Sequence, residues 1–288
     1  MILAPRSSTP GPMNLKALKE TPPWEWPQGM GKELLDVLRD QKAEESERLL
    51  AAELAGDFTV INDELVDALL ATLASGESSI ELRSQSALSL GPLLEHSDLE
   101  GFDDPDEVPV TERTLRRIQS ALQALYRDLG VPTPVRRRIL EASVRAPEDW
   151  HPEAIRVAYA SDDAAWQLSA VFAMRFVRGF NEQILDALEH EDEDVRVEAL
   201  LAAGNWELDA AWPQVAALVG SPQTEKPLLL AAIEAAATIR PREAALLLSE
   251  LGDSEDEDIS EAVFEAIAMA EGVADDDDDG YGGNGVLH

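Results

Sequence analysis

A short helical pattern recurs along this 288-residue chain, and it limits the possible folds more than any other feature. Six stretches each begin with an apolar residue and carry small or apolar residues four, five and eight positions later in most copies. They begin at Leu82, Val135, Trp166, Val195, Leu228 and Ile259. That spacing returns to one side of a helix, so each stretch predicts an amphipathic helix. Four of the five intervals between the starts are close to 31 residues, which is the length of two short helices with their turns.

A partner segment precedes each stretch. The partners carry apolar residues three or four positions apart, and turn-forming Gly, Pro, Ser or Asp residues separate the two members. They cover 65–73, 115–129, 154–159, 184–188, 211–219 and 244–251, and an earlier pair covers 32–40 and 46–56. Runs that alternate with a period of two are absent over any useful length, so a sheet is not expected. The sequence predicts an all-α fold of about seven antiparallel helix pairs.

Other features repeat together with the helices. Several second helices begin with an apolar–Arg pair, an Asp turn precedes one of them, glycine follows two of them, and proline stands in a first helix. The residues are Leu82-Arg83, Val135-Arg136, Val195-Arg196, Asp192, Asp194, Gly91, Gly204 and Pro213. In these features the chain resembles the HEAT-repeat family, close to the short bacterial kind that phycobilin lyases also contain. The copies at Trp166, Leu228 and Ile259 lack the Arg, so a continuous Arg–Asp ladder is not expected.

The resemblance covers roughly residues 30–272 and implies a right-handed α-solenoid, an α-α superhelix of about seven HEAT-like helix pairs. For residues 1–29 the sequence predicts a flexible, Pro-rich N-terminal leader, with Met13 as an alternative start. Its segment around Trp24 and Trp26 is expected to be extended and to cap the first helix pair. An acidic loop inserted at 96–111 explains the one long interval. A disordered, acidic and Gly-rich tail is predicted for 273–288, after a helix that ends near Ala270.

The charge restricts the class of partner. The chain has 57 Asp and Glu against 23 Lys and Arg, a formal charge of −34, and it contains no cysteine. Disulfides, thiolate metal sites and a cysteine nucleophile are thereby excluded. Repulsion disfavours nucleic acid or an anionic membrane as the main ligand and favours another protein that carries a basic patch. With neither a signal sequence nor a membrane-spanning segment in sight, we expect a cytoplasmic protein. Few of the basic residues are Lys, which suits either a saline cytoplasm or a GC-rich genome.

One basic island follows the acidic insertion. It contains the candidate partner-binding residues Arg113, Arg116, Arg117, Arg136, Arg137 and Arg138. Guanidinium groups bind phosphate and carboxylate bidentately, so one hypothesis is a site for a phosphate or an acidic peptide. The alternative, which we favour, is that these arginines pair with the acidic insertion and with neighbouring repeats.

Two tryptophans, Trp166 and Trp206, are further candidate partner-binding residues, because Trp contributes strongly to interfaces. They lie in an aromatic-rich stretch, 150–212, and the alternative is that they pack in the core. A pocket lined by Tyr159, Trp166 and Trp206 would instead indicate a bound ligand.

Motifs for catalysis are missing. The four histidines, His96, His151, His190 and His288, lie far apart, and neither a phosphate-binding loop nor a nucleophile elbow occurs. We therefore expect no catalytic residue, cofactor or metal. The predicted function is a non-enzymatic scaffold or adaptor that binds a partner protein along the concave face of the solenoid. One alternative is an accessory, lyase-like protein that handles a chromophore or another ligand, and a second is a nucleic-acid-related protein or an acidic DNA mimic.

Overall fold

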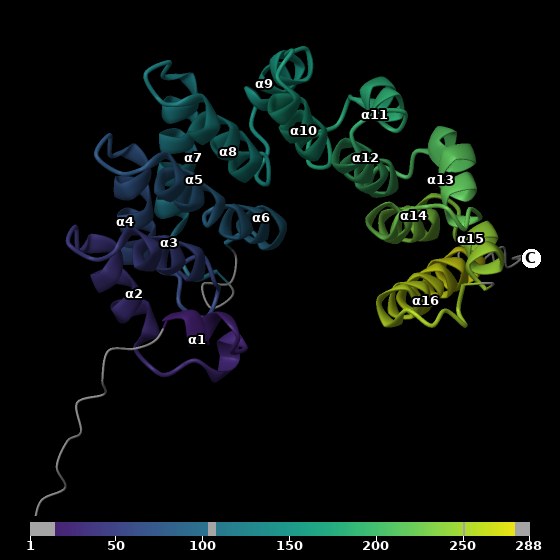
Figure 1. Ribbon diagram of the computed structural model, residues 1–288, viewed down its shortest axis with the longest axis horizontal. Coiled ribbons are helices and arrows are strands. Elements are labelled where there is room, and N and C mark those ends of the chain that lie inside the picture. Colours follow the sequence, from purple (N-terminus) through teal and green to yellow (C-terminus); the bar gives the residue numbers. More distant parts are fainter. Residues whose placement is uncertain (1–14, 103–107, 250, 280–288) are drawn as a thin grey trace, which may run out of the picture. The chain divides into compact units, whose positions relative to one another are not determined.

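The computed structural model describes residues 15–102, 108–249 and 251–279, and the regular elements in this part of the chain are helices, without a strand. The chain divides into two compact units, with the boundary between Ala146 and Pro147. Each unit is a row of helix pairs (Figure 1). The prediction of an all-helical fold is confirmed. The handedness of a solenoid and the total number of pairs stay predictions.

Within the N-terminal unit, three helix pairs stand in order. They are α2 (Met30–Arg39) with α3 (Glu45–Leu54), α4 (Asp63–Ala74) with α5 (Ile80–Leu88), and α7 (Glu112–Arg127) with α8 (Thr133–Ser143). The first helices α2, α4 and α7 pack in one row, and the second helices α3, α5 and α8 pack in another. Two additional helices, α1 (Leu15–Lys19) and α6 (Gly91–Glu100), contact α3 and α8. A connected cluster of buried Leu, Ile, Val and Ala side chains forms the core of this unit.

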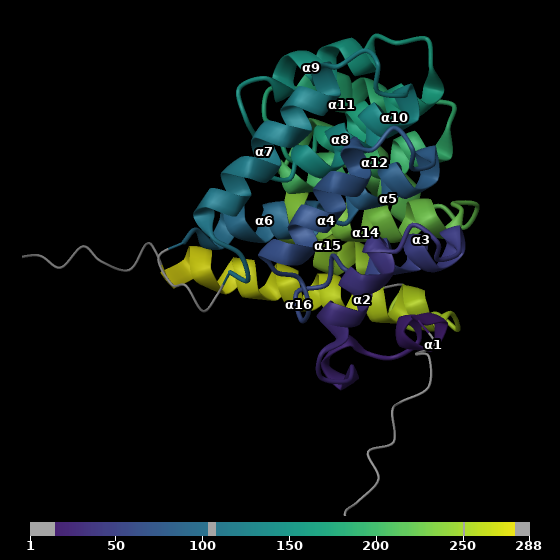
Figure 2. The same cartoon turned by 90° about the vertical axis from the view of Figure 1, so that its left-hand side faces the viewer.

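Four pairs follow in the described part of the C-terminal unit. They are α9 (His151–Tyr159) with α10 (Ala164–Ala173), α11 (Asn181–Ala187) with α12 (Glu193–Asn205), α13 (Trp212–Val219) with α14 (Lys226–Ile239), and α15 (Pro241–Leu248) with α16 (Glu257–Asp279). The 3-10 turn η2 (Asp209–Ala211) leads into α13. The second helices α10, α12, α14 and α16 contact one another in series and lie on the inside of the curve of this unit (Figure 1). Figure 2 shows α16, which has 23 residues, from the side.

Small residues allow the second helices to approach one another. On α14, Ala232, Ala235 and Ala236 are buried. A Cβ atom on Gly204 of α12 would lie 3.0 Å from the Cα of Ala235 and 3.1 Å from the Oγ1 of Thr238, which is tighter than most contacts of a Cβ atom. The glycine near the end of this helix therefore favours the close contact between α12 and α14.

A recurring arginine connects the two helices of each pair in the N-terminal unit. It is the fourth residue of the second helix, and it donates a hydrogen bond to the carbonyl oxygen of the penultimate residue of the first helix. The three bonds are Arg48 Nη2 to Leu38 O at 3.2 Å, Arg83 Nε to Leu73 O at 2.8 Å, and Arg136 Nε to Tyr126 O at 2.6 Å. Carbonyls at a helix C-terminus lack partners within the helix and carry partial negative charge, so a guanidinium stabilises them. The apolar–Arg pairs at Arg83 and Arg136 thus hold a hairpin together.

The prediction of an acidic loop at 96–111 is wrong in its first part, because α6 continues to Glu100. Leu93 and Leu94 are fully buried and anchor this helix. Pro92 sits in its first turn, where the missing N–H costs no helical hydrogen bond. The remaining acids at 103–107 lie outside the described residues.

The N-terminal tryptophan segment also differs from the prediction. Instead of an extended segment, Pro23–Glu25 form the 3-10 turn η1. Trp24 is 79% exposed, whereas Trp26 packs against the core and donates its Nε1–H to Thr21 O at 2.9 Å. Of the two tryptophans, Trp26 is therefore the one that covers apolar surface in the first unit. Residues 1–14 of the predicted leader lie outside the described residues.

The last helix is longer than predicted. It continues past Ala270 to Asp279, so a disordered segment that begins at 273 is wrong for the part that the structure describes. The rest of the predicted tail, 280–288, lies outside it. In the described residues, none of the helices is both long and apolar enough to cross a membrane.

Candidate functional site

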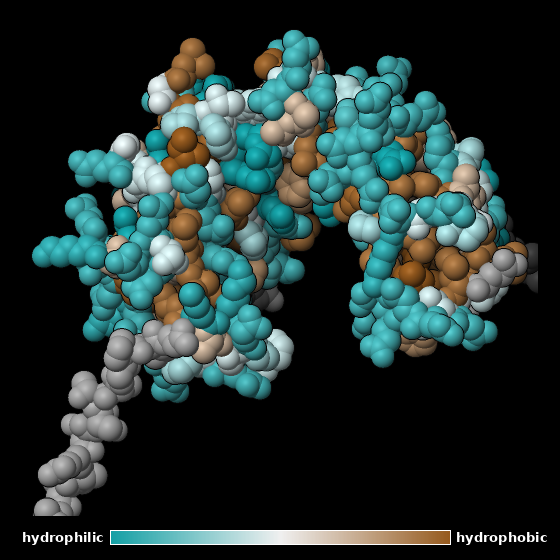
Figure 3. All heavy atoms as spheres, in the orientation of Figure 1, coloured by the Kyte–Doolittle hydropathy of each residue, from teal (hydrophilic) through white to brown (hydrophobic). Residues whose placement is uncertain are grey.

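A groove with a volume of about 600 Å³ runs over α12, α14 and α16, the second helices of the C-terminal unit. Its floor is apolar and consists of Val197, Leu201, Pro227, Leu230, Ala231, Ile233, Ala237, Ala262, Ala266 and Met269. Along α14 and α16 the lining residues recur at three- and four-residue spacing, so each helix contributes one continuous stripe. Met269, near the end of the α16 stripe, is 48% exposed. Figure 3 shows apolar surface in the part of this unit where α14, α15 and α16 lie.

Four carboxylates form the rim of the groove: Glu234 on α14, and Asp258, Glu261 and Glu265 on α16. Asp258 pairs with Lys226, whose Nζ lies 2.6 Å from its Oδ2. Lys226 also contacts Asp256 Oδ1 at 2.7 Å, and these hydrogen bonds, that to Asp256 first, raise the pKa of Lys226. The other three rim acids form no ion pair within the described part of the chain. The groove therefore combines an apolar floor with uncompensated negative charge.

Most of the arginines in the basic island are paired inside the N-terminal unit. Arg116 pairs with Glu112, Arg117 with Asp67 at 2.7 Å, and both Arg137 and Arg138 pair with Glu141. Arg136 holds Tyr126 O and stacks on the ring of Tyr126, with its guanidinium 5.3 Å from the ring centre. Nearby, Arg145 pairs with Glu95. The favoured alternative predicted pairing with the acidic insertion and with neighbouring repeats. Arg117 pairs with the neighbouring helix α4, whereas Arg116, Arg137 and Arg138 pair within their own helices, which that alternative did not predict.

Arg113 differs from its neighbours. It lies exposed in the first turn of α7 and makes no ion pair with the described residues. A single exposed guanidinium is a weak basis for a phosphate site, because bidentate recognition of a doubly charged group normally combines several donors. As a binding site, the arginine cluster stays a prediction.

The two candidate tryptophans do not come together. Trp206 caps the C-terminal end of α12 and donates its Nε1–H to Met174 O, at the end of α10, at 2.7 Å. Trp166 lies half-buried near the opposite end of α10. Trp166 and Met174 are eight residues apart, a rise of ~12 Å along the helix axis, so the two tryptophans lie at different ends of α10.

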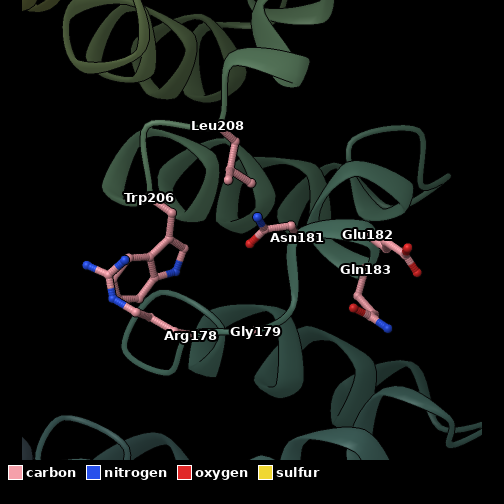
Figure 4. A pocket seen from close by; sticks show the side chains of 7 residues that line it. All are labelled: Arg178, Gly179, Asn181, Glu182, Gln183, Trp206 and Leu208. Atoms are coloured by element: carbon pink, nitrogen blue, oxygen red, sulfur yellow. The ribbon is translucent and has the colours of Figure 1, made fainter.

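Trp206 instead lines an open pocket together with the loop before α11. The pocket has a volume of about 510 Å³ and is lined by Arg178, Gly179, Asn181, Glu182, Gln183, Trp206 and Leu208. Arg178 stacks on Trp206 with its guanidinium 4.3 Å from the ring centre, and Glu182 and Gln183 extend to the other side of the pocket (Figure 4). Neither Tyr159 nor Trp166 lines it, so the three-residue pocket that would have indicated a bound ligand is not formed here. The hydroxyl of Tyr159 donates to Asp186 Oδ2 at 2.7 Å.

Backbone strain occurs beside this pocket. Glu207 has a φ of 49°, a left-handed conformation that glycine usually occupies at this place after a helix. The hydrogen bonds of Leu208 N to Ala203 O and of Glu207 N to Gly204 O form the helix-ending motif that requires it. This turn lets Trp206 and Leu208 line the same pocket.

Titratable groups with perturbed pKa values are mostly structural. His151 is fully buried and its Nδ1 accepts a hydrogen bond from the N–H of Glu148 at 2.8 Å. Burial lowers its pKa to about 4, so the ring is neutral at neutral pH. Burial, followed by the bond to Asp186, raises the pKa of Tyr159. In the described ranges, clusters of three or more His, Asp or Glu that are able to hold a metal ion are absent.

Sequence reasoning did not find the groove. Leu230 and Ala237 belong to the same helical pattern that predicts core residues, and nothing in the pattern shows that their side of α14 lacks a covering helix. One signal was available: Glu234, Glu261 and Glu265 interrupt apolar stripes at helical spacing, which indicates the edge of a solvent-facing surface.

Comparison with known proteins finds similar solved structures but no matching family model. No family model matches the chain, and no curated protein matches it. Similar solved structures include Escherichia coli YibA, with 15% identity, a TM-score of 0.45, and coverage of 85% of this chain and 82% of that chain. Human deoxyhypusine hydroxylase in complex with glycerol has 16% identity, a TM-score of 0.40, and coverage of 90% and 88%. The complex of CpcE and CpcF of phycocyanin lyase from Nostoc sp. has 19% identity, a TM-score of 0.41, and coverage of 87% and 98%. Such distant likenesses decide neither family nor activity.

Proposed function

We propose that this chain is a HEAT-like, non-enzymatic scaffold or adaptor that acts in the cytoplasm. In this proposal it binds a partner protein with a basic patch along the second helices of its C-terminal unit. The observation that carries the proposal is the acid-rimmed apolar groove over α12, α14 and α16.

The two components of the groove have different physical roles. Removing apolar floor from water supplies affinity at about 25 cal/mol per Å². The rim acids Glu234, Glu261 and Glu265 favour a cationic partner, and the formal charge of −34 accelerates its approach at low salt. The same charge opposes nucleic acid, which favours the protein-binding hypothesis over the nucleic-acid one. The pairing of most arginines of the basic island within the N-terminal unit also favours the protein-binding hypothesis over the nucleic-acid one.

The chromophore hypothesis has weaker support. Of the three aromatic residues whose common pocket would have indicated a ligand, only Trp206 lines the pocket described above. An apolar surface with a charged edge is typical of a protein interface, in which a hydrophobic centre is surrounded by polar residues.

Two matched variants test the proposal. Met269→Lys places a cation on the groove floor, whereas Leu246→Lys makes the same change on α15, where Leu246 is 77% exposed and belongs to the first-helix row. Tagged wild-type protein and both variants are used to capture partners from native lysate at low and moderate salt. We expect a Lys- and Arg-rich partner that Met269→Lys loses and Leu246→Lys retains. Equal capture by all three proteins would contradict the proposal.

A further inference from the structure

We propose that the groove over α12, α14 and α16 binds a short amphipathic α-helix that carries Lys or Arg along its flanks. The inference rests on the proposed function and specifies which kind of segment the partner inserts.

The lining of the groove leaves an extended peptide without partners for its backbone. Peptide N–H and C=O groups that are taken out of water need hydrogen-bonding partners. The floor is built from helices, whose own backbone groups are already bonded, and from apolar side chains such as Leu201 and Leu230. The described part of the chain has no strand, and so it offers no sheet edge to which a peptide could add. A helical ligand avoids this cost because it satisfies its own backbone.

A polyproline segment is also a poor fit. Grooves that bind such segments are lined by aromatic rings, and the lining of this groove contains none. Helix-in-groove binding requires an apolar floor that receives residues at helical spacing, which the stripes on α14 and α16 provide.

The length of the groove matches three helical turns. Its lining extends from Pro227 to Ala237 on α14 and from Asp258 to Met269 on α16. At 1.5 Å per residue each stripe is about 15–16 Å long, so a helix of about 11 residues spans it. Such a helix presents apolar residues at positions i, i+3, i+4 and i+7 to the floor. An extended segment of the same length has about five residues, of which only every second faces the floor.

The charges specify the flanks of the ligand. Glu261 and Glu265 lie four residues apart on α16, and Glu234 lies on α14. Basic residues at four-residue spacing on the ligand therefore meet them in register, one turn apart. An ion pair at an exposed rim contributes little affinity. The apolar floor therefore supplies most of the affinity, and the rim carboxylates supply the preference for a basic over an acidic helix.

Two peptides of about 14 residues distinguish a helical from an extended ligand. The first has Leu at the four floor-facing positions, Lys on both flanks and Gln on the outer face. The second is identical except that two central outer-face Gln residues are replaced by Pro, which prevents a continuous helix without changing the charge or the apolar residues. Fluorescence anisotropy at about 0.15 M salt measures binding of each peptide to the full chain and to the Met269→Lys and Leu246→Lys variants.

We expect the helical peptide to bind at least about tenfold more tightly than the Pro peptide, with this advantage lost in Met269→Lys and kept in Leu246→Lys. If both peptides bind equally and both depend on Met269, the helix inference is wrong while the proposed function stands. If both bind equally and Met269→Lys has no effect, attraction to net charge explains the binding, and both proposals fail. Absence of saturable binding by either peptide also overturns the helix inference, and the capture experiment then decides the proposed function separately.

Discussion

The hydrogen bond between Arg83 and the end of α4 gives the sharpest prediction about stability. Arg83 is only 7% exposed, and its Nε donates to Leu73 O at 2.8 Å. Arg83→Met keeps an unbranched apolar stem of similar length and removes the guanidinium. A hydrogen bond from a charged group contributes about 1.5–3 kcal/mol, and the favourable contact with the helix C-terminus adds about 0.3–1 kcal/mol. The cost of burying the guanidinium offsets part of this, so we expect the free energy of unfolding to fall by about 2 kcal/mol.

Urea unfolding of the full chain, followed by far-UV circular dichroism, measures the loss. Arg113→Met is the matched control, since Arg113 is exposed and forms no ion pair with the described residues; it should change the free energy of unfolding by less than about 0.5 kcal/mol. If Arg83→Met is as mild as this control, the arginine does not hold the hairpin and the reasoning is refuted.

Three further predictions concern the C-terminal unit. Glu207→Gly removes a non-glycine residue from a φ of 49° and should raise the free energy of unfolding by about 0.5–1 kcal/mol in chemical unfolding; a lower value would mean that the turn is not strained. Gly204→Ala places a Cβ 3.0 Å from the Cα of Ala235 and should cost about 1–3 kcal/mol despite the higher helix propensity of Ala, again measured by urea unfolding. The pKa of His151, lowered by burial from 6.5 to about 4, makes unfolding easier as pH falls, because the unfolded chain binds the proton first. The contribution of neutral His151 to the free energy of unfolding is complete above pH 6.5 and is lost between pH 6.5 and 4. From about pH 7.5 to 5, the free energy of unfolding should therefore fall by about 2 kcal/mol more in the wild type than in His151→Asn, a variant that keeps an acceptor for Glu148 N–H. Parallel curves of unfolding free energy against pH would contradict this prediction.

Helical periodicity predicts most of this fold because it reports directly on burial. Val195 and Leu200 of α12, for example, are buried as their spacing indicates. The role of a polar residue inside the pattern is harder to predict. Arg83 was recognised as part of a repeated motif, but only the structure shows that its partner is a carbonyl ten residues earlier in the preceding helix.

The prediction failed where a local signal had two interpretations. Gly91 was interpreted as the end of a helix, yet with Pro92 it begins α6, since both residues are tolerated in a first turn. The sequence pattern does not predict the groove, for a different reason. Leu230 and Met269 lie on different helices, and their apolar character is the same whether a neighbouring helix covers them or solvent does. Which side of a helix stays uncovered is a property of the packing, and the local sequence signals it only through the acidic residues at the edge of that side.

Cross-linking from within the groove tests most directly whether this surface binds a protein. A photo-reactive phenylalanine analogue is introduced at position 230 on α14 and, separately, at position 246 on α15, and the cross-linked segments from native lysate are sequenced. We predict that position 230 reacts with one recurring segment that carries Lys or Arg beside apolar residues at helical spacing, and that position 246 does not. Random cross-links at both positions, or a recurring acidic segment at position 230, would contradict the proposed function.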